Sequence, residues 1–249
     1  MSALAAMIYR EGKIRATNLI YLFWDLIYSL GYLLLFGVGM TRALGAPKSV
    51  GGVNYLSFFL PGVLGMSGFI IASNTAWSFF MDRDNGIFYE MLTYPLSRGQ
   101  LLLGKVMFNV FVALVQAALT VAVAAWALGA TLNASRLPLL FAGIAAGTAG
   151  WFFFFAAFAL RIRRNDVFNT LTSVFYLLIL ASSMFYPLEP LPEWLRRLSM
   201  GNPITWQVDF LRYCTLGTGA PARIAWESAA FVVFSLIFFT AASRSLQQQ

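Results

Sequence analysis

The chain has no histidine, a single cysteine at Cys214 and few charged residues. Histidine is the commonest general base and metal ligand near neutral pH, so its absence removes the first candidate for either role. One cysteine excludes a disulfide framework within the chain. Charged residues make up 11% of the 249 residues, whereas a soluble domain carries about 25%. Such a chain cannot cover itself with polar surface.

Apolar side chains instead form 59% of the sequence and give a mean hydropathy of +0.72. Much of the surface must therefore face lipid, which favours an integral membrane protein over a large soluble helical core. The net charge of +7 would suggest nucleic-acid binding in a soluble protein, but here we expect lysine and arginine to mark the cytoplasmic face and expect no nucleic acid. The N-terminus has no apolar core ahead of its charges, so we do not expect a cleavable signal peptide.

Six stretches are long and apolar enough to cross the hydrocarbon, which takes about 20 helical residues. They are residues 19–40, 55–80, 106–128, 137–160, 167–186 and 224–242. Backbone polar groups in lipid must be satisfied within each segment, so helices are expected, and the alternating pattern of a membrane barrel is missing. The sequence predicts an all-α integral membrane protein with a six-helix domain over 19–249 and an N-terminal segment over 1–18.

The distribution of basic residues predicts how these spans are oriented. With the N-terminus inside, every inner segment carries lysine or arginine, and the two short outer loops hold only Arg42, Lys48 and Arg136. This bias places both termini in the cytoplasm. The N-terminal segment is expected to lie on the inner surface as an amphipathic helix, although Glu11 and Arg15 interrupt its apolar stripe.

A charged break between the second and third spans reads FFMDRDNGIFYEMLTYPLSRGQLLLGKV, residues 79–106. Within it, residues 99–105 have the Gly-x4-Gly-Lys spacing of a phosphate-binding loop. Val106 follows where such a loop needs Ser or Thr, and three leucines occupy the interval. Ser97 and Gln100 have the spacing of a capping box, so we expect the start of a helix there instead.

Asp82 and Asp84 in the same break are spaced like a pair of magnesium ligands. Arg83 separates them and no other acidic cluster is nearby, so a solvated loop at the membrane surface is the preferred interpretation. Beyond them the sequence predicts a short amphipathic helix that Pro95 ends. Its apolar face would hold Ile87, Phe88, Met91 and Leu92, opposite Tyr89 and Glu90. On the residues alone, an interfacial helix without a partner fits equally well.

The connection after the fifth span, SSMFYPLEPLPEWLRRLSMGNPITWQVDFLRYCTLGTG, is the second distinctive stretch. Prolines at 187, 190 and 192 end the preceding helix. Residues 193–198 and 204–216 can each form a short helix, and Asp209 and Arg212 can pair at i,i+3 on the second. We expect an outer re-entrant region over 187–221, with an ordinary surface loop as the alternative.

These stretches resemble the membrane subunits of ABC-2-type transporters, and most of all the drug-resistance and nodulation-factor export permeases. The resemblance runs from about residue 10 to residue 240. It is carried by Phe59-Leu60-Pro61-Gly62, Asp82-Arg83-Asp84, Gly86, Glu90, Pro95-Leu96-Ser97-Arg98, Leu102-Leu103-Gly104-Lys105, Leu191-Pro192-Glu193-Trp194-Leu195, Asn202-Pro203-Ile204-Thr205 and Arg212.

The resemblance implies a six-span subunit that pairs into a dimer in a prokaryotic cytoplasmic membrane. A separate ATPase subunit would bind beneath it and carry the ATP and Mg²⁺, so this chain would bind no cofactor and would not be an enzyme. The partner would grip the loop 82–98 as a coupling helix, together with the basic turn after the fourth span. The implied contact residues are Asp82, Arg83, Asp84, Gly86, Phe88, Glu90, Met91, Pro95, Arg98, Arg161, Arg163 and Arg164.

The resemblance also implies that the outer re-entrant region caps an exit path. Its residues would be Pro192, Trp194, Asn202, Pro203, Asp209 and Arg212. The cargo would be an amphipathic or lipid-linked drug, lipid or glycolipid moved outward. Polar residues within the spans are candidates for lining the path, and helix–helix hydrogen bonds would explain them as well. They include Asn74, Thr75, Asn109 and Gln116.

Two other functions remain open at this point. A membrane-embedded, metal-dependent glycosyl or lipid transferase would need Asp82 and Asp84 as metal ligands. An ion-coupled carrier would show internal repeats and buried ionisable groups, and only Asp25 lies well inside a span. Asp25 could lie shallow, pair with a neighbouring cation or have a functional role.

Overall fold

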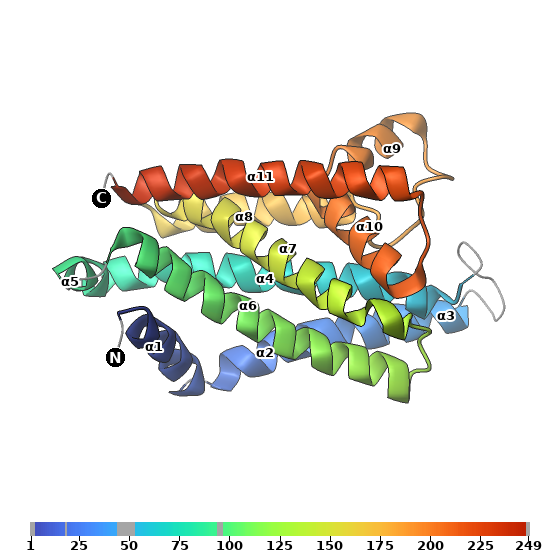
Figure 1. The fold of residues 1–249 in the computed structure, drawn as a ribbon, viewed down its shortest axis with the longest axis horizontal. Coiled ribbons are helices and arrows are strands. Elements are labelled where there is room, and N and C mark those ends of the chain that lie inside the picture. The colour runs from blue at the N-terminus through green and yellow to red at the C-terminus, as the bar shows by residue number, and fades with distance from the viewer. Residues whose placement is uncertain (1–2, 18, 44–52, 94–96, 248–249) are drawn as a thin grey trace.

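The computed structural model describes residues 3–17, 19–43, 53–93 and 97–247, and all the elements within them are helices. This agrees with the predicted all-α class. In chain order (Figure 1) they are α1 (Ala3–Thr17), α2 (Leu19–Tyr32), η1 (Leu33–Val38), α3 (Gly39–Ala43), α4 (Tyr55–Asp84), α5 (Ile87–Thr93), α6 (Arg98–Ala122), η2 (Val123–Ala127), η3 (Ala134–Arg136), α7 (Leu137–Ala159), α8 (Asn165–Leu180), α9 (Glu193–Met200), α10 (Pro203–Leu216) and α11 (Pro221–Gln247).

Among the described residues, four helices are long and apolar enough to cross a membrane: α4, α6 with η2, η3 with α7, and α11. Two further apolar helices are shorter, at Ile27–Ala43 and at α8. The fifth expected span was too long, because α8 ends at Leu180 and not at residue 186. The Ser182 hydroxyl donates to the Ile179 carbonyl at 2.6 Å, and such local bonds compete with the helical pattern.

Helix α4 runs through the middle of the bundle, between α6 and α8 in Figure 1. Nearly all of its apolar length is buried, whereas little of the apolar length of α11 is buried. Its Phe69 ring packs against Trp151 and Phe155 of α7, with ring centroids 4.9 Å apart in both pairs. Edge-to-face contacts of this kind add to the burial of the rings themselves. The aromatic core between α4 and α7 therefore fixes the central pair of helices.

The two ends of the bundle differ in what they carry. One end gathers α1, α5 and the C-terminal end of α11, so both ends of the chain lie there (Figure 1). Arg98 at the start of α6 donates to the carbonyls of Leu246, at 2.9 Å, and Gln247 at the end of α11. The other end carries α3, α9 and α10 (Figure 1).

The second distinctive stretch forms the two short helices that its sequence predicts, α9 and α10. Asn202 caps α10, because its side-chain oxygen accepts from the Ile204 amide at 3.0 Å, and Pro203 occupies the first turn. Ile204, Val208 and Leu211 are buried. α10 is thus a packed element between α4, α7 and α11 and not a free surface loop.

Gly62 lets α4 approach the chain just after α8. A methyl group at this position would lie 2.5 Å from Met184 Cγ and 3.1 Å from the Met184 carbonyl oxygen. Small residues permit such close packing in membrane bundles, where there is no hydrophobic force between helices. Gly62 near the start of α4 is therefore explained by packing.

We expect Gly62→Ala to lower the free energy of unfolding by about 1–3 kcal/mol, because the methyl group overpacks a site that includes backbone. Thermal unfolding in detergent measures the loss. Gly31→Ala is the matched control, since no atom lies within 4 Å of its added methyl group, and it should unfold at or slightly above the native temperature. Equal stability of the two variants would contradict this account of Gly62.

Candidate functional site

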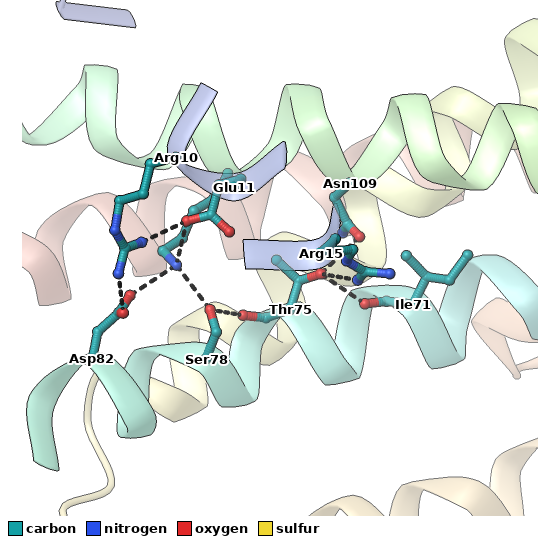
Figure 2. Close-up of polar contacts among 9 residues, drawn as sticks. Arg10, Glu11, Arg15, Ile71, Thr75, Ser78, Asp82 and Asn109 are labelled. Carbon is teal, nitrogen blue, oxygen red and sulfur yellow. Dashed lines mark hydrogen bonds and ion pairs between the residues drawn. The ribbon is translucent and has the colours of Figure 1, made fainter. Parts of the chain in front are cut away.

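Four charged side chains from three helices meet near the end of the bundle that carries α1 and α5 (Figure 2). Arg10 and Glu11 come from α1, Asp82 from the last turn of α4 and Lys105 from α6. We call this group the inner ion network. Two of its members, Asp82 and Lys105, belong to the two partial motifs of the charged break.

Lys105 lies at the centre of the inner ion network, and its side chain has no exposed surface. Its ammonium donates to Glu11 Oε1 at 3.1 Å, Asp82 Oδ2 at 3.0 Å and Ser78 Oγ at 2.8 Å. An ammonium group has three N–H donors, so every one of them is used. The nitrogen also lies 5.1 Å from the centre of the Phe79 ring. Lys105 is thus fully satisfied without water.

Arg10 completes the network. Its guanidinium donates to Glu11 Oε1 at 2.8 Å and forms an ion pair with Asp82 Oδ1. Two cations face two carboxylates, so the formal charges cancel, as burial requires. Both Asp82 oxygens are bound by cations. This carboxylate is therefore a structural partner and a poor candidate for the magnesium ligand that a transferase would need.

Asp82 differs from the solvated loop that its sequence predicts. It lies in the last turn of α4, which extends four residues beyond the predicted end at residue 80, and it is 6% exposed. The reason is tertiary: Lys105 and Arg10 neutralise the carboxylate and allow the helix to continue with it buried. Asp84 is exposed, and Gly86 turns the chain with a φ of +74°.

Helix α5 follows this turn. Phe88 and Met91 are buried against the bundle and Glu90 is exposed, as the predicted amphipathic helix requires. The side chains of Tyr89 and Leu92 and the whole of Pro95 lie outside what the structure describes. The predicted capping box is confirmed: Ser97 accepts from the Gln100 amide, and the Gln100 side chain accepts from the Ser97 amide.

Arg83 ties α5 to the end of α7. Its guanidinium donates to the carbonyls of Ala159 at 3.2 Å and Ile162 at 3.1 Å, and it lies over the rings of Phe80 and Phe88 at 5.4 and 5.9 Å. It therefore fixes the position of the turn between α7 and α8. That turn carries three exposed basic side chains, those of Arg161, Arg163 and Arg164.

The polar residues proposed for a substrate path do not lie together. Asn109 is fully buried and its Oδ1 lies 2.8 Å from the Thr75 hydroxyl. Gln116 is buried too and donates to Ser29, which pairs with Ser67. These bonds join α6 to α4 and α2 in the way that helix–helix hydrogen bonds do.

Asn74 has a different environment, since its side chain is exposed on a cavity of about 450 Å³ between α2, α4 and α8. Tyr28, Tyr32 and Tyr176 line the same cavity, along with Met66 and other apolar side chains. Phenol and amide groups among apolar walls suit an amphipathic molecule. Asn74 is the one of the four named path candidates that lines this cavity, a space that a ligand could occupy. The side chain of Asp25 lies outside the described side chains.

A second ion network, the outer ion network, lies at the opposite end. Asp209 and Arg212 form the predicted pair at 2.8 Å, and Asp209 also binds Arg223 at 2.8 Å. Arg223 in turn binds the buried Glu227 at 2.7 Å. Arg212 donates to the Ser183 carbonyl at 2.7 Å and lies 4.0 Å from the centre of the Phe58 ring.

The other residues predicted for the outer re-entrant region lie at or near the starts of α9 and α10. Asn202 caps α10 and donates through its Nδ2 to the Leu178 carbonyl at 2.6 Å. Pro192 precedes α9 and Pro203 begins α10. Trp194 is 69% exposed, as an interfacial ring would be.

Sequence reasoning did not find Glu11, Arg10, Arg223 or Glu227 as site residues. A signal was present for three of them. Glu11 interrupts the apolar stripe of α1, and Arg223 and Glu227 stand at the i,i+4 spacing of a helical ion pair. Glu11 bonds to Lys105 and Arg223 to Asp209, which are more distant in sequence, so the sequence did not show these pairings.

The described part of the chain is an all-helical bundle with four long apolar helices and ionic groups gathered at its two ends, which is the architecture of a multi-pass membrane protein. The family model described as ABC-2 type transporter matches residues 2–216. The chain belongs to this family of transport permeases.

Two relatives support the assignment. "Probable multidrug ABC transporter permease YbhR" of Escherichia coli (strain K12) is 26% identical over 194 residues, which cover 78% of this chain and 51% of that protein. "Putative transport permease ycf38" of Cyanophora paradoxa is 27% identical over 200 residues, which cover 76% of this chain and 65% of that protein. The chain thus spans about half the length of the first of these relatives.

Replacement of Lys105 by methionine should lower the free energy of unfolding by about 3–5 kcal/mol, because it leaves a buried excess of negative charge. Denaturant unfolding in mixed micelles measures this loss. The double variant Lys105→Met/Asp82→Asn restores neutrality and should recover at least half of it. A double variant as unstable as the sum of its two singles would show that the inner ion network is not coupled.

Proposed function

We propose that this chain is the membrane-spanning permease of an ATP-driven ABC-2 exporter. A separate ATPase subunit binds its inner end, carries the ATP and Mg²⁺ and drives an amphipathic or lipid-linked molecule outward. The membrane is a prokaryotic cytoplasmic membrane, and both termini and α5 face the cytoplasm. Six spans follow if the shorter helices Ile27–Ala43 and α8 cross together with the four long ones.

The single observation that carries the proposal is the family match over residues 2–216. The geometry at the inner end supports it further. α5 presents Glu90 to solvent while Phe88 holds it to the bundle, and Arg83 fixes the neighbouring basic turn. A short helix beside three exposed arginines offers both shape and charge for a protein partner.

The inner ion network supplies a route for movement. Asp82 lies five residues before α5 and binds Lys105 of α6 and Arg10 of α1. A displacement of α5 by the partner would therefore act on three helices at once. ATP can drive such a change only if the nucleotide-bound partner binds two conformations of the permease with different affinity. The closed partner would favour one position of α5 and the open partner another.

The path for the cargo would form between two copies of the chain. Large apolar side chains are exposed on two of the three helices around the Asn74 cavity, α2 and α8. On α2 they include Ile20, Phe23, Trp24 and Ile27, and on α8 they include Val167, Val174, Leu177 and Leu180. A second copy packed on these faces would cover them and would enclose the two cavities along one axis.

Glu90→Arg should reduce the amount of ATPase subunit that co-purifies with the chain by about tenfold, because it reverses charge on the contact surface. Glu193→Arg is the matched control, since Glu193 is an exposed glutamate on the short helix α9 at the opposite end. Unchanged association of the Glu90 variant would show that Glu90 on α5 does not contribute to the contact with the ATPase subunit.

The purified chain alone should hydrolyse no ATP, and hydrolysis by the chain itself would overturn the proposal.

A cysteine introduced at Gly86 should react with a membrane-impermeant maleimide only after the cells are opened, because this turn faces the cytoplasm in the proposed orientation. A cysteine at Arg196, which is partly exposed on α9, should react in intact cells. The native Cys214 is buried and gives little background. Labelling of position 86 in intact cells would show that this turn lies outside the cell, which contradicts the proposed orientation and rules out a cytoplasmic ATPase contact at α5.

A further inference from the structure

A cavity of about 570 Å³ opens beside the outer ion network. Its apolar walls come from α4, α10, α11 and the chain between α8 and α9. They include Phe58, Pro187, Leu188, Leu216 and Ile224. Drug-sized molecules bind in clefts of about 300–1,000 Å³ with mostly apolar linings. The space thus has the size and the lining of a small-molecule site, and it is separate from the cavity around Asn74.

The charges around this cavity do not balance. Asp209, Arg212 and Arg223 line it, and Glu227 binds Arg223 from behind. Each guanidinium is matched by one of these two carboxylates, so the four groups are neutral together. Glu189 also lines the cavity and lies close enough to act electrostatically on both arginines. Within the part of the chain that the structure describes, no ion pair binds Glu189.

Among the residues that the structure describes, Glu189 therefore gives the cavity one formal negative charge in excess. Its carboxylate is exposed at the edge of the space, whereas the two arginines are held by bonds within the protein. An anion entering the cavity would meet guanidinium groups that are already paired with Asp209 and Glu227, and it would also face this carboxylate. A cation would meet a carboxylate that forms no ion pair with the described residues, beside a wall of low polarity, where attraction between charges is stronger than in water.

We propose that this cavity binds a lipophilic organic cation, with Glu189 as the residue that selects its charge. The apolar walls favour a cation whose charge is spread over aromatic or alkyl groups, since such a cation loses little hydration on entering. The site lies at the outer end in the proposed orientation, so its role in receiving outgoing cargo rests on the proposed function. The binding of the cation itself does not depend on the proposed function.

The probe is tetraphenylphosphonium, an aromatic cation, measured by equilibrium dialysis against the full-length purified chain in lipid nanodiscs. We expect saturable binding above that of empty nanodiscs, and an affinity about tenfold lower for Glu189→Gln. Glu193→Gln is the control, because Glu193 is an exposed glutamate nearby in sequence that does not line the cavity; it should bind like the native chain. Ala220→Trp should abolish binding by filling the space, since Ala220 lines it.

Tetraphenylborate, an anion of the same shape, separates charge selection from simple partitioning into lipid. It should show no saturable binding to the native chain. Equal affinity of Glu189→Gln and the native chain for the cation, or saturable binding of the borate at the same site, would overturn the proposal. The assay contains no ATPase subunit and no ATP. A failure of α5 to bind an ATPase would therefore leave this result intact, and loss of cation binding would leave the permease assignment intact.

Discussion

A buried ammonium group on Lys105 sets the positions of three helices. Lysine is almost never fully buried unless it is paired, because the loss of hydration must be offset by bonds within the protein. Here the offset comes from Glu11 of α1, Asp82 of α4 and Ser78 of α4. If any of the three helices moved by a few ångströms, a buried charge would lose its partner. The end of the bundle that carries α1 and α5 is consequently held by electrostatics as well as by apolar packing.

Small residues reinforce this arrangement at the same place. A methyl group at Gly104, next to Lys105, would lie 2.7 Å from Met7 Cβ of α1. The absence of a side chain lets α1 lie close enough for Glu11 to reach the ammonium group. Close packing and ion pairing thus depend on each other, and the N-terminal helix packs against α6.

α4 connects the two ionic ends of the molecule. It contributes Asp82 to the inner ion network and, at its other end, the Phe58 ring on which Arg212 lies. Between them its side chains are buried against α7 in a continuous aromatic core. A helix packed on all sides moves as a rigid element. In the proposed mechanism, α4 is therefore the element through which a displacement of α5 would reach the outer cavity.

The sequence by itself determined the helical class, the apolar runs, the capping box at Ser97, the short helix before it and the Asp209–Arg212 pair. These features depend on local chemistry: on apolar length, on side chains within one turn of each other and on the constraints of proline. Tertiary structure decided the rest. It paired Asp82 with Lys105 and Arg10, directed Arg83 to the end of α7, buried Asn109 and Gln116 away from Asn74, and left Glu189 facing a cavity. Each of these outcomes depends on which helices lie side by side, because a charge or a polar group takes its role from partners that are distant in the chain.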